Sequence, residues 1–302
     1  MSLERAREVF RKFRGIRVRL DLMGGEPFMH QRLDRIVASA RGEARLGEIV
    51  VYTNATLVTP EAARSARAAG LDRAMVNISS HDPGKHDAFT GVSGSWERTV
   101  AGIGHLKAAG VDTAAFIVLH RENMGDYDRL REFACERLGV RPLFFQYVPA
   151  HGIDELTPEP AAWADLKRLI LYRDEPRHRR SITRINALCG KCCLGGHFSL
   201  SVKVNGDVTP CPFVDDVVLG NVFRDDFWEV FAGREPPAAW RDFMSVPAGC
   251  AGCSYAALCG GGCRAGHRDP EGRYRLRDFR CLGPWPAPFD PDALWDRLPT
   301  FF

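Results

Sequence analysis

The stretch Cys250-Ala-Gly-Cys253-Ser-Tyr-Ala-Ala-Leu-Cys259-Gly-Gly-Gly-Cys263 sets four cysteines at the spacing C-x2-C-x5-C-x3-C. A further cysteine, Cys281, follows it, and nine of the ten cysteines lie from Cys189 onward. Disulfide-dense proteins are usually short secreted domains in which the bridges replace a missing core, whereas 302 residues can bury a core of their own. The pattern therefore favours thiolates that bind metal in a reducing compartment.

The kind of metal centre can be argued from the spacing. C-x2-C pairs are common in zinc ribbons, where four thiolates make a closed tetrahedral site, so the pair Cys250 and Cys253 alone would favour zinc. The x5 and x3 spacings, the late Cys281 and the G-x4-C sequence from Gly206 to Cys211 favour iron–sulfur clusters instead. Cys135 lies in a helical pattern far from the others, and we expect it to be a small buried residue.

Composition limits the partners. The net charge of +3 is too small to indicate binding to nucleic acid or to an anionic membrane surface. No apolar stretch approaches the ~18 residues of a membrane span, and the charged N-terminal segment lacks the apolar core of a signal peptide. We expect a cytoplasmic protein with no nucleic-acid or membrane partner.

Strand-like and helix-like segments alternate through the first part of the chain. An amphipathic helix is expected over 3–13, and five strand–helix pairs follow it: 17–22 with 31–42, 48–53 with 60–70, 73–79 with 95–109, 113–119 with 124–138, and 142–148 with 159–172. Glycines at 70, 110 and 139 stand where three of these helices should end. Repeated strand–helix pairs at short spacing predict an α/β fold with a parallel sheet or barrel.

The second part of the chain is organised differently. Residues 173–186 are basic and interrupted by proline, and we expect a solvated linker there, although a groove for an acidic peptide is an alternative. Residues 198–204 alternate, and Asn205-Gly206-Asp207 predicts the turn of a β-hairpin that leads to Cys211. Residues 225–245 have a helical pattern, and the tail from Pro284 onward is expected to be extended.

Polar residues stand at the predicted strand ends, where parallel barrels place their ligands. Met23-Gly24-Gly25-Glu26-Pro27 follows the first strand, and its glycines would let backbone carbonyls approach a ligand amine. Glu26 could fix this loop or accept a hydrogen bond from that amine, although a Gly-Gly pair after a strand can also be just a turn. Polar side chains at 120–123 and 146 would face the same cavity.

Together these motifs resemble the radical SAM enzymes that carry a C-terminal SPASM domain. The resemblance implies an α/β fold in two parts, a partial (β/α)6 TIM-like barrel and a small cysteine-rich SPASM domain with a β-hairpin. The family's first strand and its C-x3-C-x2-C cluster loop precede the helix that 3–13 resembles, and the first cysteine of this sequence is Cys135. We therefore expect a barrel that lacks this strand and loop over 1–172, a linker over 173–188 and a SPASM domain over 189–302.

The resemblance also implies an S-adenosylmethionine (SAM) site at the strand ends. In the family the Gly-Gly-Glu-Pro loop holds the methionine amino group, and polar residues after the next two strands contact the rest of SAM. The residues that match are Gly24, Gly25, Glu26, Pro27, Thr53, Asn54, Ser79 and Ser80. The family often has an arginine where this chain has Thr90. This difference weakens the assignment of the family's residue roles to individual residues of this chain.

Two auxiliary [4Fe–4S] clusters follow from the same resemblance. The first would be held by Cys193, Cys211 and Cys263, with a fourth ligand that is Cys189 or Cys192. We favour Cys189, because adjacent side chains such as those of Cys192 and Cys193 diverge in an extended backbone. The second cluster would be held by Cys250, Cys253, Cys259 and Cys281.

Family members use SAM and a third, reduced [4Fe–4S] cluster to form a 5′-deoxyadenosyl radical. One explanation for the absent triad is that this chain is a fragment of an enzyme that modifies a peptide or protein, such as a peptide maturase or a sulfatase-maturase-like enzyme. That enzyme would bind SAM and the third cluster once the missing segment is present, and it would take electrons from a flavodoxin or ferredoxin. The alternative is a complete but non-catalytic iron–sulfur or electron-transfer protein on a degenerate barrel.

Overall fold

The computed structural model describes residues 1–44, 47–149, 155–169, 195–196, 199–226, 229, 235–266, 268–281 and 283–284. The chain divides into two compact units, Met1–Tyr147 and Val148–Phe302. The expected linker over 173–188 and the tail beyond 284 lie outside the described residues. The boundaries predicted for the barrel, linker and SPASM domain stay predictions.

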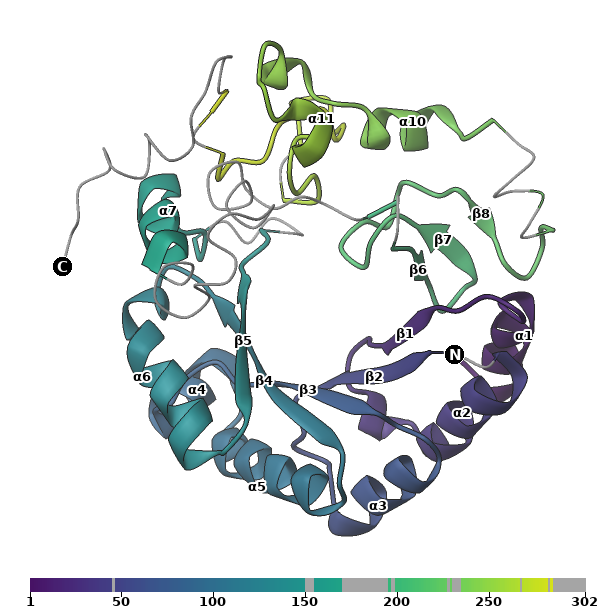
Figure 1. The fold of residues 1–302 in the computed structure, drawn as a ribbon, viewed down its shortest axis with the longest axis vertical. Coiled ribbons are helices and arrows are strands. Elements are labelled where there is room, and N and C mark those ends of the chain that lie inside the picture. Colours follow the sequence, from purple (N-terminus) through teal and green to yellow (C-terminus); the bar gives the residue numbers. More distant parts are fainter. Residues whose placement is uncertain are drawn as a thin grey trace. The chain divides into compact units, whose positions relative to one another are not determined.

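The first unit is built on one parallel sheet in the order β1-β2-β3-β4-β5, so each strand pairs with the next in the sequence. Figure 1 shows the sheet as a curved layer with helices α1 to α6 along one of its faces. The strands are β1 (Arg19–Leu22), β2 (Glu48–Thr53), β3 (Arg73–Asn77), β4 (Asp112–Leu119) and β5 (Arg141–Gln146). This confirms the predicted parallel α/β fold.

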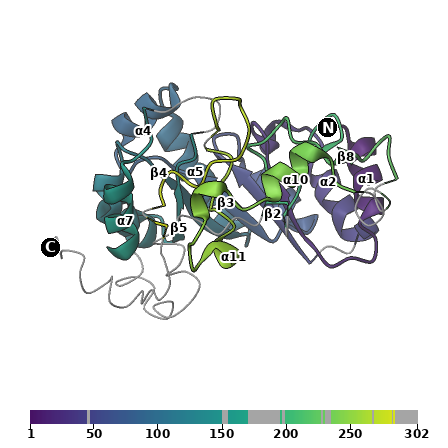
Figure 2. The same cartoon turned by 90° about the horizontal axis from the view of Figure 1, so that it is seen from above.

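Helices connect the strands, as the alternation predicted. They are α1 (Leu3–Lys12), α2 (Leu33–Ser39), α3 (Pro60–Ala68), α4 (Pro83–Thr90), α5 (Ser95–Ala108) and α6 (Tyr127–Glu132). Short 3-10 turns, η1 (Pro27–Met29) and η3 (Met124–Asp126), and single π-turns, η2 (Ala40–Ala44) and η4 (Phe133–Arg137), extend or precede them. Helix α1 lies beside α2 in both views (Figures 1 and 2).

The strands form where apolar residues run almost without interruption. In β2, residues Ile49, Val50 and Val51 are all fully buried, the pattern expected of a parallel strand that is covered on both faces. On one face of the sheet Val50, Met75 and Ala114 form a cluster, and Tyr52, Phe116 and Leu143 pack against it. Burial on both faces therefore holds the sheet that carries the strand ends.

Helix ends follow the glycine prediction. Gly70, Gly110 and Gly139 all adopt left-handed backbone angles directly after their helices, with φ of 106°, 76° and 61°. Helix α4 was not predicted, although its signals are present: Asp82 caps it, Pro83 opens it and left-handed Gly91 ends it. Within the described residues, no helix is long and apolar enough to cross a membrane.

The second unit has little regular structure in its described part. Strands β6 (Ser201–Val202), β7 (Asp207–Thr209) and β8 (Gly220–Asn221) form an antiparallel sheet, which confirms the predicted hairpin. Gly206 in its turn has a φ of 94°, and a Cβ there would overlap the Phe223 ring. The helical segments are α7 (Pro160–Leu169), α10 (Ala238–Met244), η8 (Ala248–Cys250) and α11 (Ala256–Cys259).

One helix prediction in this unit is wrong. Residues 225–245 do not form a continuous helix, because 225–226 and 235–237 are not helical and α10 begins only at Ala238. The physical reason is the pair Pro236 and Pro237, which lack the backbone N–H and restrict the preceding residue to extended angles. Residues 227–228 and 230–234 lie outside the described part.

Candidate functional site

The loop after β1 is tied to the end of β2 by the Glu26 carboxylate. Glu26 Oε1 accepts hydrogen bonds from the Phe28 amide at 2.9 Å and the Thr53 hydroxyl at 2.6 Å, and Oε2 accepts from the Asn54 amide at 2.7 Å. A carboxylate has about four acceptor sites, and three are used here. Of the two roles predicted for Glu26, the structure shows that of fixing the loop.

The backbone of the same loop is accessible beside its two glycines. Gly24 has a φ of 137°, which side-chain-bearing residues rarely adopt. A Cβ built on Gly24 or on Gly25 would meet no atom within 4 Å, so both peptide units border open space. Pro27 then opens the 3-10 turn η1 and ends the exposed loop. The glycines can therefore present backbone groups to a ligand.

The end of β2 continues into a strained turn. Thr53 Oγ1 accepts from the amide of Ala55 at 2.8 Å, and Asn54 Oδ1 accepts from the amide of Thr56 at 2.9 Å. Ala55 is the one residue other than glycine in the described part with a positive φ, at 59°. Such a conformation costs free energy and persists only where the surroundings impose it. Here Gly102 of α5 leaves the space for Ala55, because a Cβ at 102 would overlap the Ala55 carbonyl.

Ser79 and Ser80 lie at the end of β3 and are both buried. The Ser79 amide donates to His86 Nδ1 at 3.2 Å, and Ser80 Oγ accepts from the Asp82 amide at 3.1 Å. Asn123 Nδ2 donates to the Ser79 carbonyl at 3.2 Å and to the Val118 carbonyl at 3.0 Å, which joins the ends of β3 and β4. The predicted SAM residues thus form two groups, one at the ends of β1 and β2 and one at the end of β3.

Helix α5 holds both groups, and its residues were missed as site residues by the sequence reasoning. Thr99 Oγ1 donates to the Asn54 carbonyl at 2.8 Å, and Trp96 Nε1 donates to the Ser80 carbonyl at 3.3 Å. The two side chains are three positions apart and share one face of the helix. The sequence signal that could have identified them is a tryptophan and a threonine three positions apart in the helix predicted over 95–109.

The start of α5 is itself fixed from α4. Asp87 Oδ1 accepts from the Trp96 amide and the Ser95 hydroxyl, each at 2.9 Å, and Oδ2 accepts from the Gly94 amide at 2.5 Å. The bond from the Trp96 amide is the largest cause that lowers the pKa of Asp87. A carboxylate at a helix N-terminus also interacts favourably with the helix dipole.

A buried histidine stands at the end of β4. His120 stacks on Phe89 with ring centroids 4.8 Å apart, and its Nδ1 accepts from the Glu122 amide at 3.3 Å. Its Nε2 has no hydrogen-bond partner among the described residues. Burial lowers the pKa of His120, so the imidazole is neutral at pH 7 and Nε2 carries the proton.

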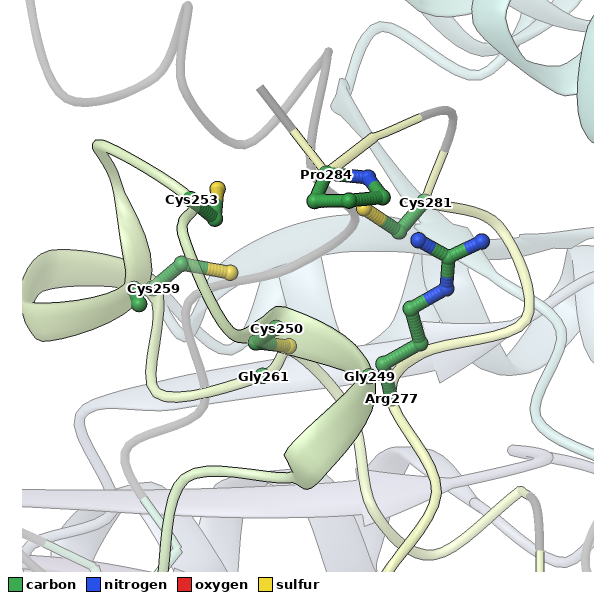
Figure 3. Close-up of a pocket in the computed structure, with 9 residues that line it drawn as sticks. Gly249, Cys250, Cys253, Cys259, Gly261, Arg277, Cys281 and Pro284 are labelled. Carbon is green, nitrogen blue, oxygen red and sulfur yellow. The ribbon is translucent and has the colours of Figure 1, made fainter. Parts of the chain in front are cut away.

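In the second unit four cysteines converge on one pocket. It is lined by Cys250, Cys253, Cys259 and Cys281 together with Gly249, Ala256, Gly261, Arg277 and Pro284. Figure 3 shows the thiols arranged around one space, with Cys259 and Cys281 pointing into it from opposite sides. The four are the residues predicted to hold the second auxiliary cluster. Within the described ranges, no group of three or more histidine, cysteine, aspartate or glutamate side chains is arranged to hold one metal ion.

Two thiols of this pocket, those of Cys250 and Cys259, stay protonated unless a cation binds them. Burial, and then the neighbouring Cys281 and Cys253, raise the pKa of Cys250. Burial raises the pKa of Cys259 to about 12. A coordinated metal deprotonates a thiol and neutralises the thiolate, so a donor set of four converging thiols fits a cationic iron–sulfur centre.

Glycines shape the backbone around this pocket. Gly260, Gly261 and Gly262 have φ of 63°, 91° and 77° in succession. A Cβ on Gly261 would overlap Pro247, and one on Gly262 would overlap Asp278. Only glycine allows this close curl between Cys259 and Cys263.

Two ligands predicted for the first auxiliary cluster lie against a common core. Cys211 and Cys263 both pack on the cluster of buried residues formed by Val214, Val217, Trp240, Phe243, Ala265 and Tyr274. The other predicted ligands, Cys189 and Cys193, and the alternative Cys192 lie outside the described residues. The two described members of this ligand set therefore border the same core.

The prediction that Cys135 is buried is wrong. It lies in the π-turn η4 with an exposed side chain. The buried stripe of this segment consists of Leu130, Phe133, Ala134 and Leu138. Cys135 comes directly after Ala134 of that stripe and therefore lies on the outward side of the helix.

Comparison with known families agrees with this geometry. Residues 1–134 match the radical SAM superfamily, and residues 178–254 match the SPASM domain, an iron–sulfur cluster-binding domain. The chain belongs to the radical SAM proteins that carry a SPASM domain.

Its relatives have different activities. The chain is 26% identical over 288 residues to the AdoMet-dependent heme synthase of Nitratidesulfovibrio vulgaris, covering 85% of this chain and 77% of the relative. It is 28% identical to the PqqA peptide cyclase of Ruegeria pomeroyi, covering 82% and 69%. The solved structure of Streptococcus suis SuiB bound to the precursor peptide SuiA shares the fold at a TM-score of 0.72 and 17% identity, over 93% of this chain and 69% of SuiB.

Proposed function

We infer that this chain serves radical SAM chemistry on a peptide or protein substrate. SAM binds at the strand ends of the first unit, and two auxiliary [4Fe–4S] clusters are held by cysteines of the second. The observation that carries the proposal is the convergence of Cys250, Cys253, Cys259 and Cys281 on one pocket. The PqqA peptide cyclase and peptide-bound SuiB support a peptide as the substrate class.

The residues around the clusters divide into two ligand sets. Cys250, Cys253, Cys259 and Cys281 would hold the second auxiliary cluster, and Cys193, Cys211, Cys263 and Cys189 the first. When bound, such clusters supply one-electron redox chemistry. The protein contributes the curled glycine backbone, the burial that excludes water and the arginines nearby.

At the strand ends the chain contributes a preformed loop. Glu26 holds the β1 loop against the β2 end, which keeps the peptide units of Gly24 and Gly25 beside open space. Thr99 and Trp96 fix the carbonyls of Asn54 and Ser80 from behind. These contacts would orient the amino acid end of SAM without further rearrangement.

The test of the cluster assignment is iron content after anaerobic reconstitution. We expect about eight irons and a brown protein, since two clusters of four irons need eight thiolates. Cys259→Ala and Cys211→Ala should each remove roughly four irons. The control is Cys135→Ala, which should remove none because the Cys135 side chain is exposed. A colourless zinc protein that takes up no iron would overturn the proposal.

The test of the SAM site is a binding titration with SAM in a longer protein that supplies the upstream cluster loop. Glu26→Gln should weaken binding by roughly tenfold or more, because it removes a charged acceptor from three hydrogen bonds that hold the loop. His81→Gln, at the end of β3, should change it by less than about twofold. Equal and negligible effects of both changes would show that the segment is only a turn.

The heme synthases favour a second substrate class, because three of them match this chain at 26–28% identity. A titration with protoporphyrin IX, followed by its absorption band, separates the two classes. A saturable shift at micromolar protein would favour a tetrapyrrole substrate. Mass changes in a peptide pool treated with SAM, reductant and a protein extended by an upstream cluster loop would favour the peptide.

The catalytic status can be measured separately. The sequence has no cysteine before Cys135, so the chain by itself has no triad for a third cluster in its barrel. We expect it to form no 5′-deoxyadenosine from SAM with a strong reductant, and multiple turnovers would contradict this. Restored activity on adding an upstream cluster loop would favour the enzyme over the non-catalytic alternative. The flavodoxin or ferredoxin reductant and the cytoplasmic location stay predictions.

A further inference from the structure

An arginine lines the four-cysteine pocket of the second unit, the pocket formed by Cys250, Cys253, Cys259 and Cys281. This residue, Arg277, is half-buried, and its stem passes Gly249, where a Cβ would meet Arg277 Cδ at 3.7 Å. Figure 3 shows the guanidinium pointing toward Cys281. The stem therefore packs on the pocket wall, and the charged end of the side chain lies at the thiols.

Arg277 also holds the segment that follows Cys281. Its Nη1 donates to the Gly283 carbonyl, and the Gly283 amide donates to Cys281 Sγ at 3.3 Å. Pro284, the next residue, lines the same pocket. One intervening residue thus connects the guanidinium to the sulfur of a predicted cluster ligand.

Arg277 differs from the other arginines between 268 and 280 in its partner. Each of the other four pairs with a carboxylate: Arg268 with Asp216, Arg273 with Asp269, Arg275 with Asp242 and Arg280 with Asp278. The pair of Arg280 and Asp278 is fully buried, with side chains 1% and 0% exposed. Arg277 instead donates to a carbonyl and makes no ion pair with any residue that the structure describes. No described carboxylate therefore compensates its charge beside the thiols.

We propose that Arg277 raises the reduction potential of the second auxiliary cluster, the one assigned to the four-cysteine pocket. This inference rests on the proposed function. Reduction adds one negative charge to such a cluster, so a positive charge at its thiolates favours the reduced form. The N–H···S bond from Gly283 acts in the same direction. The charge is the main agent, because a backbone hydrogen bond can persist without the arginine.

The test is an anaerobic redox titration of the reconstituted protein with dithionite, followed by electron paramagnetic resonance. Arg277→Met should lower the potential of one cluster by about 59 mV, the equivalent of a tenfold change in a one-electron equilibrium, and leave the other unchanged. Arg277→Lys keeps the charge and should retain most of the wild-type potential. Arg275→Met is the matched control and should shift neither potential, because the charge of Arg275 is already paired with Asp242.

A further variant separates the effect of charge from structural support. Arg277→Gln keeps a donor for the Gly283 carbonyl but removes the charge, so it should retain about eight irons and show the lowered potential. Repeating the titration in Cys211→Ala, which should keep only the cluster of the four-cysteine pocket, identifies the cluster affected.

The outcomes separate this inference from the function on which it rests. Wild-type protein without iron overturns both. Iron-loaded variants with unchanged potentials, with equal shifts of both clusters, or with Arg277→Lys as low as Arg277→Met overturn the tuning by charge alone. Loss of four irons in the Met, Lys and Gln variants alike would show that Arg277 only supports the structure, and would also overturn it.

Discussion

Different forces stabilise each of the two units of this chain. In Met1–Tyr147, buried apolar strands pair in parallel, and helices α1 to α6 lie along one face of their sheet. In the second unit the described strands are two or three residues long, and its buried residues include Arg264, Asp278 and Arg280. Apolar burial and backbone hydrogen bonds are enough for the first unit, whereas the second combines a small core with charges and thiols that are costly to bury alone.

Left-handed glycines show the same contrast. In the first unit Gly70, Gly110 and Gly139 end helices. In the second, Gly260 to Gly262 curl the chain between two predicted cluster ligands. Glycine serves regular secondary structure in one unit and a binding site in the other. The second unit should therefore depend on its metal, and the first should not.

Removing the metal should produce the largest difference in stability between the two units. Chelation of iron from the reconstituted protein should raise amide hydrogen exchange at 247–266 and 268–281 by at least about a hundredfold, because the free energy of metal binding is also folding free energy. Amides of β2 to β4 should keep their protection. Equal loss in both units, or none in either, would contradict the contrast.

Breaking the buried ion pair should have the next largest effect. Asp278→Ala leaves the Arg280 charge buried without its carboxylate and should lower the free energy of unfolding of the second unit by about 3–5 kcal/mol in urea denaturation. Glu235→Ala is the matched control, since it breaks an ion pair with Arg241 whose side chains are 80% and 51% exposed. This loss should cost no more than about 1 kcal/mol. Similar costs for both would mean that burial is not the source of the difference.

Within the first unit the close approach of α5 to the β2 end can be tested with two glycines of one helix. Gly102→Ala would overlap the Ala55 carbonyl and should destabilise the unit by about 1–3 kcal/mol. Gly104→Ala meets no atom within 4 Å and should stabilise the helix by roughly 0.5–1 kcal/mol. Thermal unfolding of both variants measures the difference, and equal shifts would show that Ala55 can move aside.

The smallest expected effect is a pH dependence of the first unit. Hydrogen bonds, first from the Trp96 amide, lower the pKa of Asp87 in the folded state. The stabilisation is therefore complete above its usual value of about 3.9 and is lost as the pH falls through the lower folded value. The difference in Tm between wild type and Asp87→Asn should be clear at pH 7 and shrink toward pH 3. A difference that does not change with pH would contradict this role of the carboxylate.

Most of the architecture and much of the candidate site could be read from the sequence. Apolar runs such as that of β2 and the glycines after helices are local signals, because periodicity records which face of an element is buried. The spacing of Cys250, Cys253 and Cys259 is likewise a local signal, because the three cysteines lie within ten residues of one another in the sequence. The break of the predicted 225–245 helix was also readable in its two prolines, and helix α4 in its cap and stop signals.

The tertiary structure alone decided which distant residues meet. Glu26 accepts a hydrogen bond from Thr53, 27 positions away, and Thr99 of α5 donates one to the Asn54 carbonyl. Cys281 lines the same pocket as Cys250. The packing of the elements likewise turned Cys135 outward and enclosed Asp278 with Arg280 beside Cys263. Such pairings leave no periodic trace in a single sequence, because they depend on how helices and loops far apart in the chain pack in space.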